Sequence, residues 1–187
     1  MPLDVLPTDT YQQFKIRRGF FRLNGSTILP GGVNFSIYSS GATSCELILF
    51  KNNAKEPFAT IPFPPNYRLG NVFAMIVFDL DYENIEYGFR IDGKYNIRKG
   101  DIYDKSKILL DPYAKMVSGR NEWGVLPDKN NIFQYRSKVA INDFELETDP
   151  PITTAQNDLI IYEAHLRGFT QHKSSGVKHR GTYAGFI

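Results

Sequence analysis

A cluster of polar side chains near the C-terminal end carries the residue types best suited to chemistry in this sequence. Glu163, His165 and Arg167 follow directly on the short apolar run 158–162. A run of this length, containing two isoleucines and flanked by polar residues, is typical of a buried strand. Polar side chains at the carboxyl end of a parallel strand occupy the place where α/β folds carry their active sites. The spacing therefore predicts a strand with a candidate site at its end.

Neither a metal nor a cofactor is expected at this cluster. His165, His172 and His179 recur every seven residues and could fill three positions of a zinc site. They straddle a strand end and a loop that contains serine and glycine, and no cysteine lies nearby, so no metal ligand is assigned. The sequence contains no G-x-G-x-x-G, P-loop or Ser/Cys–His triad signature. We therefore expect no cofactor.

Short runs of alternating apolar and polar residues dominate the chain before residue 150. Val33, Phe35 and Ile37 alternate with polar neighbours at the period of two that a half-buried antiparallel strand requires. Further strands are expected at 46–50, 58–61, 73–80 and 87–91. Gly, Pro and Asn separate these runs, and short strands at close spacing indicate an all-β sandwich.

Turn signals and changes in composition divide the chain into segments. Asn24-Gly25 predicts a hairpin within residues 14–29, and Asp92-Gly93 predicts a second hairpin turn. Thr182 is expected to cap the start of a helix. The expected organisation is an irregular arm at 1–13, a β-sandwich at 14–135, a linker at 136–157 and the start of a second domain at 158–187.

The bulk composition excludes some classes of partner. Lys and Arg number 22 against 20 Asp and Glu, and this net charge of +2 is too small to indicate binding to nucleic acid or to an anionic membrane. The longest apolar run, 72–78, is far shorter than the roughly 20 residues of a membrane span. The N-terminus lacks the features of a signal peptide, and the single Cys45 excludes an intramolecular disulfide. We therefore expect a cytoplasmic protein without nucleic-acid or membrane partners.

Several ordered motifs resemble those of one enzyme family. Residues 161–170, Ile-Tyr-Glu-Ala-His-Leu-Arg-Gly-Phe-Thr, with Arg-Gly-Thr-Tyr-Ala-Gly at 180–185, resemble the first barrel strand of the α-amylase family of glycoside hydrolases, family 13. They are most similar to the debranching branch, which comprises isoamylases, bacterial glycogen debranching enzymes and pullulanases. Segments 32–39, 87–93 and 110–115 resemble the β-sandwich that precedes those barrels, the family 48 carbohydrate-binding module.

This resemblance implies a fold and an activity. The fold would be an all-β, immunoglobulin-like sandwich followed by the first strand of a truncated (β/α)8 barrel, on which the sandwich packs. The complete enzyme would be a retaining α-1,6-glucosidase that acts on glycogen, amylopectin or branched maltodextrin. Such hydrolysis uses a pair of carboxyl groups, which the family carries on later barrel strands. Glu163 is the only acid at the end of the expected strand, so no catalytic residue is assigned.

Substrate contacts are expected from aromatic and polar side chains. Sugar rings stack on exposed aromatic faces, and the resemblance implies that a strand-end cluster lies near the active-site mouth of a complete barrel. The residues selected on these grounds are Trp123, Tyr162, His165 and Arg167. Composition alone adds Tyr38, Tyr67 and Tyr95. Glycogen-binding versions of the module use paired tryptophans, whereas this chain contains one.

Two other functions remain open on the sequence. The chain could be a stand-alone, non-catalytic α-glucan-binding or adaptor module, which would require glycan affinity from these 187 residues alone. It could also be a β-sandwich that serves only as a structural scaffold.

Overall fold

The computed structural model describes residues 5–119, 125, 126, 128, 130–141 and 153–187. The chain divides into two compact units, Met1–Asp143 and Phe144–Ile187. The first unit is built mainly from strands, and the described residues 153–187 of the second form short helical turns. Each unit is described by itself.

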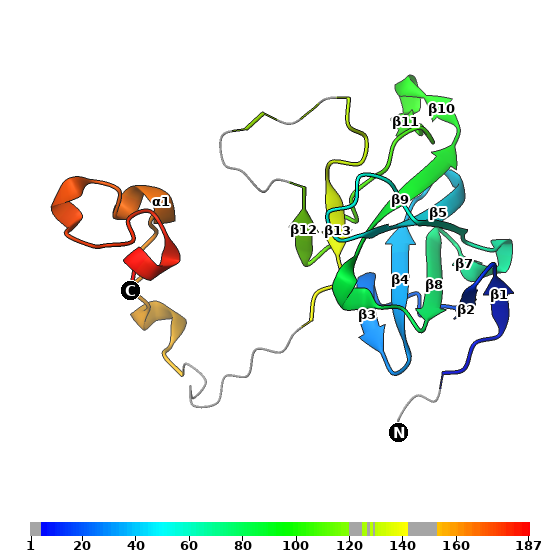
Figure 1. Cartoon of the computed structure of the whole chain (residues 1–187), viewed down its shortest axis with the longest axis horizontal. Coiled ribbons are helices and arrows are strands. Elements are labelled where there is room, and N and C mark those ends of the chain that lie inside the picture. Colours follow the sequence, from blue (N-terminus) through cyan, green and yellow to red (C-terminus); the bar gives the residue numbers. More distant parts are fainter. Residues whose placement is uncertain (1–4, 120–124, 127, 129, 142–152) are drawn as a thin grey trace. The chain divides into compact units, whose positions relative to one another are not determined.

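The N-terminal unit is a sandwich of antiparallel sheets (Figure 1). In spatial order, the first sheet contains β1 (Asp9–Tyr11), β2 (Phe14–Arg18), β8 (Val72–Phe78), β4 (Gly32–Tyr38) and β3 (Gly25–Leu29), with β7 (Arg68–Leu69) paired to β8. The second contains β12 (Met116–Ser118), β13 (Arg136–Lys138), β9 (Ile85–Gly93), β5 (Ala42–Lys51) and β6 (Ala59–Pro62). A separate ribbon joins β10 (Tyr95–Asn96) and β11 (Asp101–Ile102). The expected all-β sandwich is confirmed.

Short 3₁₀ turns punctuate the strands of this unit. They are η1 (Pro65–Tyr67), η2 (Tyr82–Asn84) and η3 (Ile97–Lys99). The prolines at 64 and 65 suit the start of η1, because proline fixes the backbone angle that a first helical position needs.

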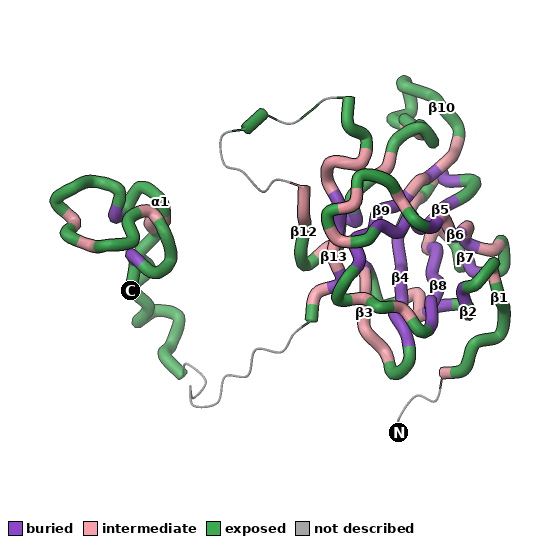
Figure 2. Tube along the Cα trace, viewed as in Figure 1, coloured by how far each residue is buried: buried purple, intermediate pink, exposed green. Residues whose placement is uncertain are grey.

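The core lies between the two sheets and follows the alternation of the sequence. Val33, Phe35 and Ile37 of β4 belong to one buried cluster with Tyr87 and Phe89 of β9. In Figure 2, much of β4 and β9 is purple, the colour of buried residues. The rings of Phe35 and Tyr87 meet edge to face, with centroids 5.0 Å apart. Burying a large apolar side chain contributes about 1.5–3 kcal/mol to folding, so the contact between Phe35 and Tyr87 stabilises the packing of the two sheets.

The hairpin expected within residues 14–29 is wrong. β2 pairs with β1 and β8, whereas β3 pairs with β4 near the other edge of the sheet. The connecting segment is fixed by the buried Asn34, whose Oδ1 accepts a hydrogen bond from Phe20 N at 2.7 Å. Asn34 Nδ2 also donates to the carbonyls of Phe20 and Leu23, both at 3.3 Å. The hydrogen bonds of the Asn34 side chain therefore set the path of the chain between β2 and β3, and the Asn24-Gly25 turn signal does not produce a hairpin.

The turn expected at Asp92-Gly93 is also wrong, because both residues belong to β9. They pair there with Ser44 and Ala42 of β5. The chain bends back later and pairs with β9, where Phe89 and Leu109 exchange backbone hydrogen bonds of 2.9 and 2.8 Å. Gly88 permits this approach, since a Cβ at that position would lie 2.6 Å from the side chain of Ile108.

Two strands lie in segments that the sequence assigned to irregular structure. β1 falls within the expected arm at 1–13, and β13 falls within the expected linker at 136–157. β13 pairs with both β9 and β12, and Ser137 and Val139 are buried. The second sheet therefore continues past residue 135.

The C-terminal unit does not form the strand expected at 158–162. It contains η4 (Gln156–Asp158), α1 (Leu166–Phe169), η5 (Lys173–Ser175) and η6 (Tyr183–Gly185), and the described residues 159–165 pair with no strand. A parallel strand needs hydrogen-bonding neighbours, and this unit offers none in its described part. No helix among the described residues is long and apolar enough to cross a membrane.

Candidate functional site

The residues selected from the sequence fall into separate parts of the chain. Trp123 lies outside the described residues. Tyr162, His165 and Arg167 lie together in the C-terminal unit, where all three are exposed. The ring of Tyr162 meets Phe169 edge to face, with centroids 6.0 Å apart. His165 uses its ring to cap α1, because its Nδ1 accepts a hydrogen bond from Gly168 N at 3.0 Å.

The C-terminal loop is held by hydroxyl groups. The buried Thr170 accepts a hydrogen bond on Oγ1 from Gly181 N at 2.8 Å, and its carbonyl accepts one from Ser175 Oγ at 2.9 Å. Thr182 caps η6, since its Oγ1 accepts from Gly185 N at 3.3 Å, as the sequence predicts for a helix start there. Among the described residues, no group of histidine, cysteine or carboxylate side chains could hold a metal ion.

The tyrosines selected by composition differ in exposure. Tyr38 and Tyr95 are 54% and 64% exposed and remain available to a ligand. Tyr67 is buried and donates a hydrogen bond to Asp9 at 2.5 Å. Burial and this bond raise the pKa of Tyr67 to about 12. Tyr67 therefore serves the packing of β1 and cannot act as a stacking surface.

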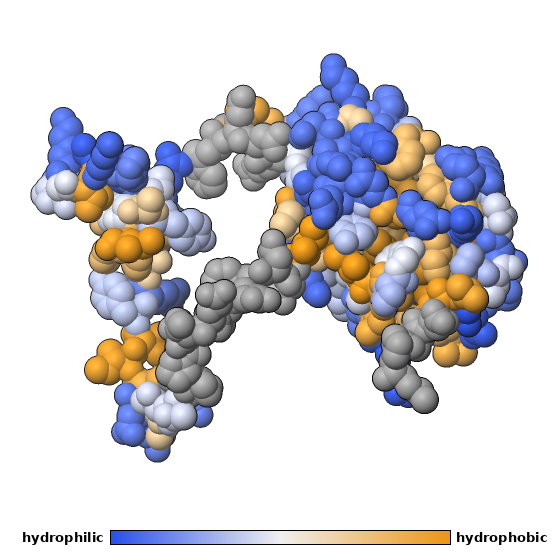
Figure 3. Space-filling view, turned by 60° about the horizontal axis from the view of Figure 1, so that its bottom comes forward, coloured by the Kyte–Doolittle hydropathy of each residue, from blue (hydrophilic) through white to orange (hydrophobic). Residues whose placement is uncertain are grey.

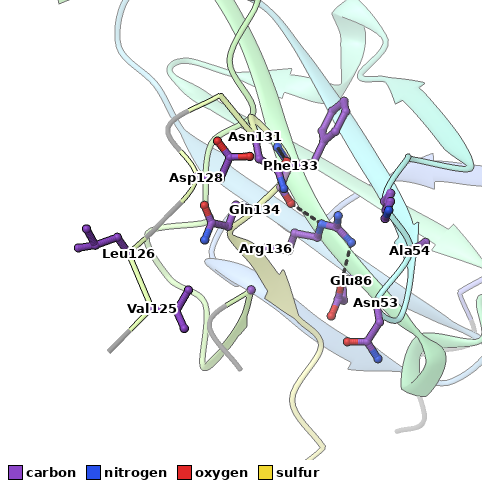
Figure 4. A pocket seen from close by; sticks show the side chains of 12 residues that line it. Asn53, Ala54, Glu86, Val125, Leu126, Asp128, Asn131, Phe133, Gln134 and Arg136 are labelled. Atoms are coloured by element: carbon purple, nitrogen blue, oxygen red, sulfur yellow. Dashed lines mark hydrogen bonds and ion pairs between the residues drawn. The ribbon is translucent and has the colours of Figure 1, made fainter. Parts of the chain in front are cut away.

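A polar pocket opens on the sandwich beside β13 (Figure 4). It has a volume of about 380 Å³, within the range of roughly 300–1,000 Å³ typical of small-molecule sites. We call it the Arg136 pocket. Its lining comprises Asn53, Ala54, Lys55, Glu86, Gly119, Val125, Leu126, Asp128, Asn131, Phe133, Gln134 and Arg136.

A buried ion pair forms the base of the Arg136 pocket. Arg136 Nη1 lies 2.9 Å from Glu86 Oε2, and the two side chains are only 8% and 5% exposed. Arg136 Nε donates to the carbonyl of Phe133 at 2.7 Å, and its guanidinium lies 4.0 Å from the centre of the Phe50 ring. Removing a charge from water is costly unless it is paired, so these three contacts fix the guanidinium in place.

Side-chain amides line the wall formed by residues 131–134. Asn131 Oδ1 accepts a hydrogen bond from Phe133 N at 3.0 Å, which leaves its NH₂ group to donate. Gln134 Oε1 is shielded from solvent and has no hydrogen-bond partner among the described residues. Gly119 packs against the Gln134 carbonyl at φ +102°, a conformation that favours glycine. The wall therefore presents planar donors and acceptors to the pocket.

A second hollow of about 450 Å³ lies where Tyr38 of β4 faces the segment 102–112. Its lining is largely apolar and includes Ile91, Leu109 and Pro112. Tyr103 closes one side, since its hydroxyl accepts a hydrogen bond from Gly41 N at 2.8 Å. This groove offers one exposed aromatic face, that of Tyr38.

A buried acid ties this segment to the second sheet. Tyr87 donates to Asp111 Oδ2 at 2.6 Å, Tyr113 N donates to Asp111 Oδ1 at 2.8 Å, and Asp111 N donates to Ser137 Oγ at 3.0 Å. Burial raises the pKa of Asp111 despite these donors, and it also raises the pKa of Tyr87. The group is structural, because its bonds to Tyr87 of β9 and Ser137 of β13 tie the segment to the second sheet.

Sequence reasoning missed the Arg136 pocket. Its principal residues come from segments read as irregular or as linker, and they meet only because β13 pairs with β9. No local pattern indicates that Arg136 pairs with Glu86, 50 residues away.

Comparison with known proteins identifies the sandwich. Residues 24–114 match the family model described as carbohydrate-binding module 48, isoamylase N-terminal domain. The chloroplastic isoamylase SU1 of Zea mays is 39% identical over 170 residues, covering 87% of this chain and 22% of that protein. A glycogen debranching enzyme of Cronobacter sakazakii is 33% identical, covering 82% of this chain and 24% of that protein. The chain thus spans about a quarter or less of these relatives.

A solved structure supports the same assignment. The pullulanase of Anoxybacillus sp. LM18-11, complexed with maltotriose, superposes with a TM-score of 0.63 at 26% identity. The match covers 87% of this chain and 20% of the pullulanase chain.

The expected cytoplasmic location is contradicted by the relatives. Isoamylases of Zea mays, Oryza sativa and Arabidopsis thaliana, each 39% identical to this chain, are named chloroplastic. A single cysteine indicates a reducing compartment, and that argument does not distinguish one reducing compartment from another. The resemblance found in the motifs, in contrast, is confirmed: residues 24–114 match carbohydrate-binding module 48, the isoamylase N-terminal domain, and more than four fifths of the chain is similar to isoamylases and glycogen debranching enzymes.

Proposed function

We propose that this chain is the N-terminal portion of a hydrolase that cleaves α-1,6 branch linkages of glycogen, amylopectin or branched maltodextrin. One observation carries the proposal: similarity to isoamylase extends over 170 residues, well beyond the family-model match at 24–114. The sandwich and the C-terminal motifs thus occur in the same order as in a debranching enzyme. The proposed roles are a sandwich that begins with β1 and extends through β13, a linker after it and a barrel start at 158–187.

The chain is proposed to lack catalysis of its own. A retaining glycosidase needs two carboxyl groups about 5–5.5 Å apart on either side of the bond. Glu163 stands in an exposed stretch of backbone that pairs with no strand, and Asp158 is the only other Asp or Glu among the described residues 153–187. Catalytic carboxylates would come from later barrel strands.

The C-terminal unit exposes large apolar side chains, as expected of a segment that packs against another domain. Ile160 and Ile161 are 97% and 85% exposed, and hydrophobic side chains reach the surface of this unit in the space-filling view (Figure 3). Exposed adjacent isoleucines favour burial in a sheet. We assign 158–162 to the first strand of a barrel on which the sandwich packs, with Tyr162, His165 and Arg167 near its mouth. Trp123 is assigned a glycan contact.

Two measurements test this function. An immunoblot of the source cell with an antibody against this chain is expected to detect a band several hundred residues longer than 187 residues. The protein in that band, once purified, is expected to release linear chains from amylopectin, and the 187-residue chain to release none. A native band at about 21 kDa would contradict the enzyme and support a stand-alone glucan-binding or scaffold module.

A further inference from the structure

A two-stranded ribbon next to the end of β9 exposes apolar side chains that the core does not use. We call residues 94–102 the basic ribbon; its strands, β10 and β11, pair only with each other among the described strands (Figure 1). Tyr95 of β10 pairs with Ile102 of β11, and these residues are 64% and 65% exposed. Ile97, in the turn between the two strands, is 66% exposed. Large exposed apolar side chains gathered in one place indicate a contact surface.

Basic side chains surround these apolar residues. Lys94, Arg98 and Lys99 are exposed and form no ion pair with a described residue. Asp101 is the only acidic residue of the basic ribbon, which alone therefore has the net charge of +2 that the whole chain has. The turn projects into open space, since a Cβ at Gly100 would meet no atom within 4 Å. The basic ribbon thus combines an apolar tip with a positive rim.

An anionic lipid surface matches both features. Apolar and tyrosine side chains favour the boundary between lipid headgroups and acyl chains, and each Lys or Arg beside an anionic membrane adds to the attraction. A protein partner fits less well, because each side of a standard protein interface supplies roughly 20–30 residues and the basic ribbon is far smaller. A neutral glucan would leave the three basic side chains unused. The expectation of no membrane partner rests on the charge of the whole chain, which does not report this local concentration.

We propose that the basic ribbon binds the surface of an anionic phospholipid bilayer. The three apolar side chains insert at the level of the headgroups, and the three basic side chains contact the anionic groups of the lipids. This contact is peripheral, so it requires no helix that crosses the membrane. The inference goes beyond the proposed debranching function and does not depend on it.

Co-sedimentation of the 187-residue chain with lipid vesicles tests this surface. One set of vesicles contains phosphatidylcholine alone, and the other contains about one third phosphatidylserine, which supplies the negative surface potential. We expect binding to the anionic vesicles only. Added salt should weaken this binding, because it screens the attraction between the basic side chains and the lipids.

A pair of charge-removing variants assigns the binding to the basic ribbon. Arg98→Gln combined with Lys99→Gln should weaken binding to the anionic vesicles about thirtyfold, since two of the basic contacts are lost. Lys55→Gln combined with Lys115→Gln removes the same number of charges from exposed residues outside the ribbon. This control pair should bind within about twofold of the wild type.

A second pair of variants tests the apolar tip. Ile97→Ser should weaken binding about tenfold, because it removes one inserted apolar side chain. Leu69→Ser makes a similar change at a residue of β7 that is 58% exposed, and should leave vesicle binding unchanged. All the substituted residues are exposed, so the Tm of each variant should equal that of the wild type. The Tm thus separates a loss of binding from a loss of folding.

Three results would overturn the membrane contact. Absence of wild-type binding to the anionic vesicles would do so, and would leave the basic ribbon to a protein partner with acidic groups around an apolar pocket. Equal binding to both kinds of vesicle would show that the basic side chains play no part. Equal weakening by the ribbon pair and the control pair would show that binding follows the overall charge. The debranching function is tested separately, by the release of linear chains from amylopectin.

Discussion

In the sandwich, Phe35, Leu47 and Tyr87 are fully buried, whereas in the C-terminal unit Ile160 is 97% and Ile161 85% exposed. Figure 2 shows the same contrast along the chain, with buried residues concentrated in the strands. Burial of apolar area is the main source of folding free energy, so the sandwich supplies its own stability. In the C-terminal unit, Thr170 and Thr182 accept hydrogen bonds from the backbone N–H groups of Gly181 and Gly185, and Ser175 donates one to the Thr170 carbonyl. The sandwich thus provides the stability of the fold, and the C-terminal unit provides an exposed apolar surface for a partner.

The largest expected change in the free energy of unfolding comes from removing one aromatic ring. It tests whether aromatic side chains stabilise the sandwich more than the C-terminal unit. Phe35→Ala should lower the free energy of unfolding by about 3–5 kcal/mol, since it leaves a cavity at the contact with Tyr87. Phe186→Ala, at a ring that is 45% exposed, should change it by less than about 1 kcal/mol. Urea denaturation of both variants measures the difference. Similar losses would show that the two units share one cooperative core.

The second-largest expected change in the free energy of unfolding comes from breaking the buried ion pair at the base of the Arg136 pocket. Arg136→Met should cost about 3 kcal/mol, because it leaves Glu86 buried without its partner. Lys15→Met removes an ion pair of nearly the same length, 3.0 Å to Asp79, but between exposed side chains, and should cost less than about 1 kcal/mol. The same denaturation measurement applies. An Arg136→Met variant as stable as the wild type would mean that β13 does not depend on this pair.

A smaller, local effect is expected in the C-terminal unit. Thr170→Val keeps the shape of the buried side chain but leaves the N–H of Gly181 without its acceptor, at a cost of about 1–2 kcal/mol to local opening. Hydrogen exchange at the Gly181 amide should accelerate about tenfold or more. The exposed Thr154→Val provides the matched control. Unchanged exchange at Gly181 would remove Thr170 as the residue that closes this loop.

The smallest expected effect is a pH dependence within the sandwich. Burial raises the pKa of Asp111 above its ordinary value of 3.8, so the folded state binds this proton more tightly than the unfolded state does. The stabilising contribution of protonation is full below pH 3.8 and is lost as the pH rises through the raised pKa. Asp111→Asn, which cannot titrate, should therefore lose less stability than the wild type over that interval. Denaturation midpoints across a pH series check this, and parallel curves would contradict it.

Period-two alternation predicted the strands that face the core, because burial on one face leaves its signature in the local sequence. β4, β5 and β9 thus appear where Val33–Ile37, Glu46–Phe50 and Tyr87–Ile91 alternate or run apolar. The order of strands was not predictable in the same way. Asn24-Gly25 has the composition of a hairpin turn. However, Phe20 in the segment before it is hydrogen-bonded to the Asn34 side chain, and β2 and β3 lie apart in the sheet.

The Arg136 pocket was even less predictable from the local sequence. Arg136 and Glu86 are 50 residues apart and meet only through strand pairing, so no spacing rule connects them. The motif at 161–170 did indicate the family, because it is contiguous. Its expected strand is not formed here, since strand geometry requires neighbours that the described part of this unit does not contain.

Gly88 has a consequence for protein engineering. The segment that carries Ile108 and Leu109 pairs with β9 next to Gly88, where a Cβ would lie 2.6 Å from the Ile108 side chain. Position 88 and residues 106–110 therefore behave as a single unit of variation in directed evolution. Libraries that keep isoleucine at position 108 should therefore keep glycine at position 88, whereas a side chain at position 88 calls for a smaller one at position 108.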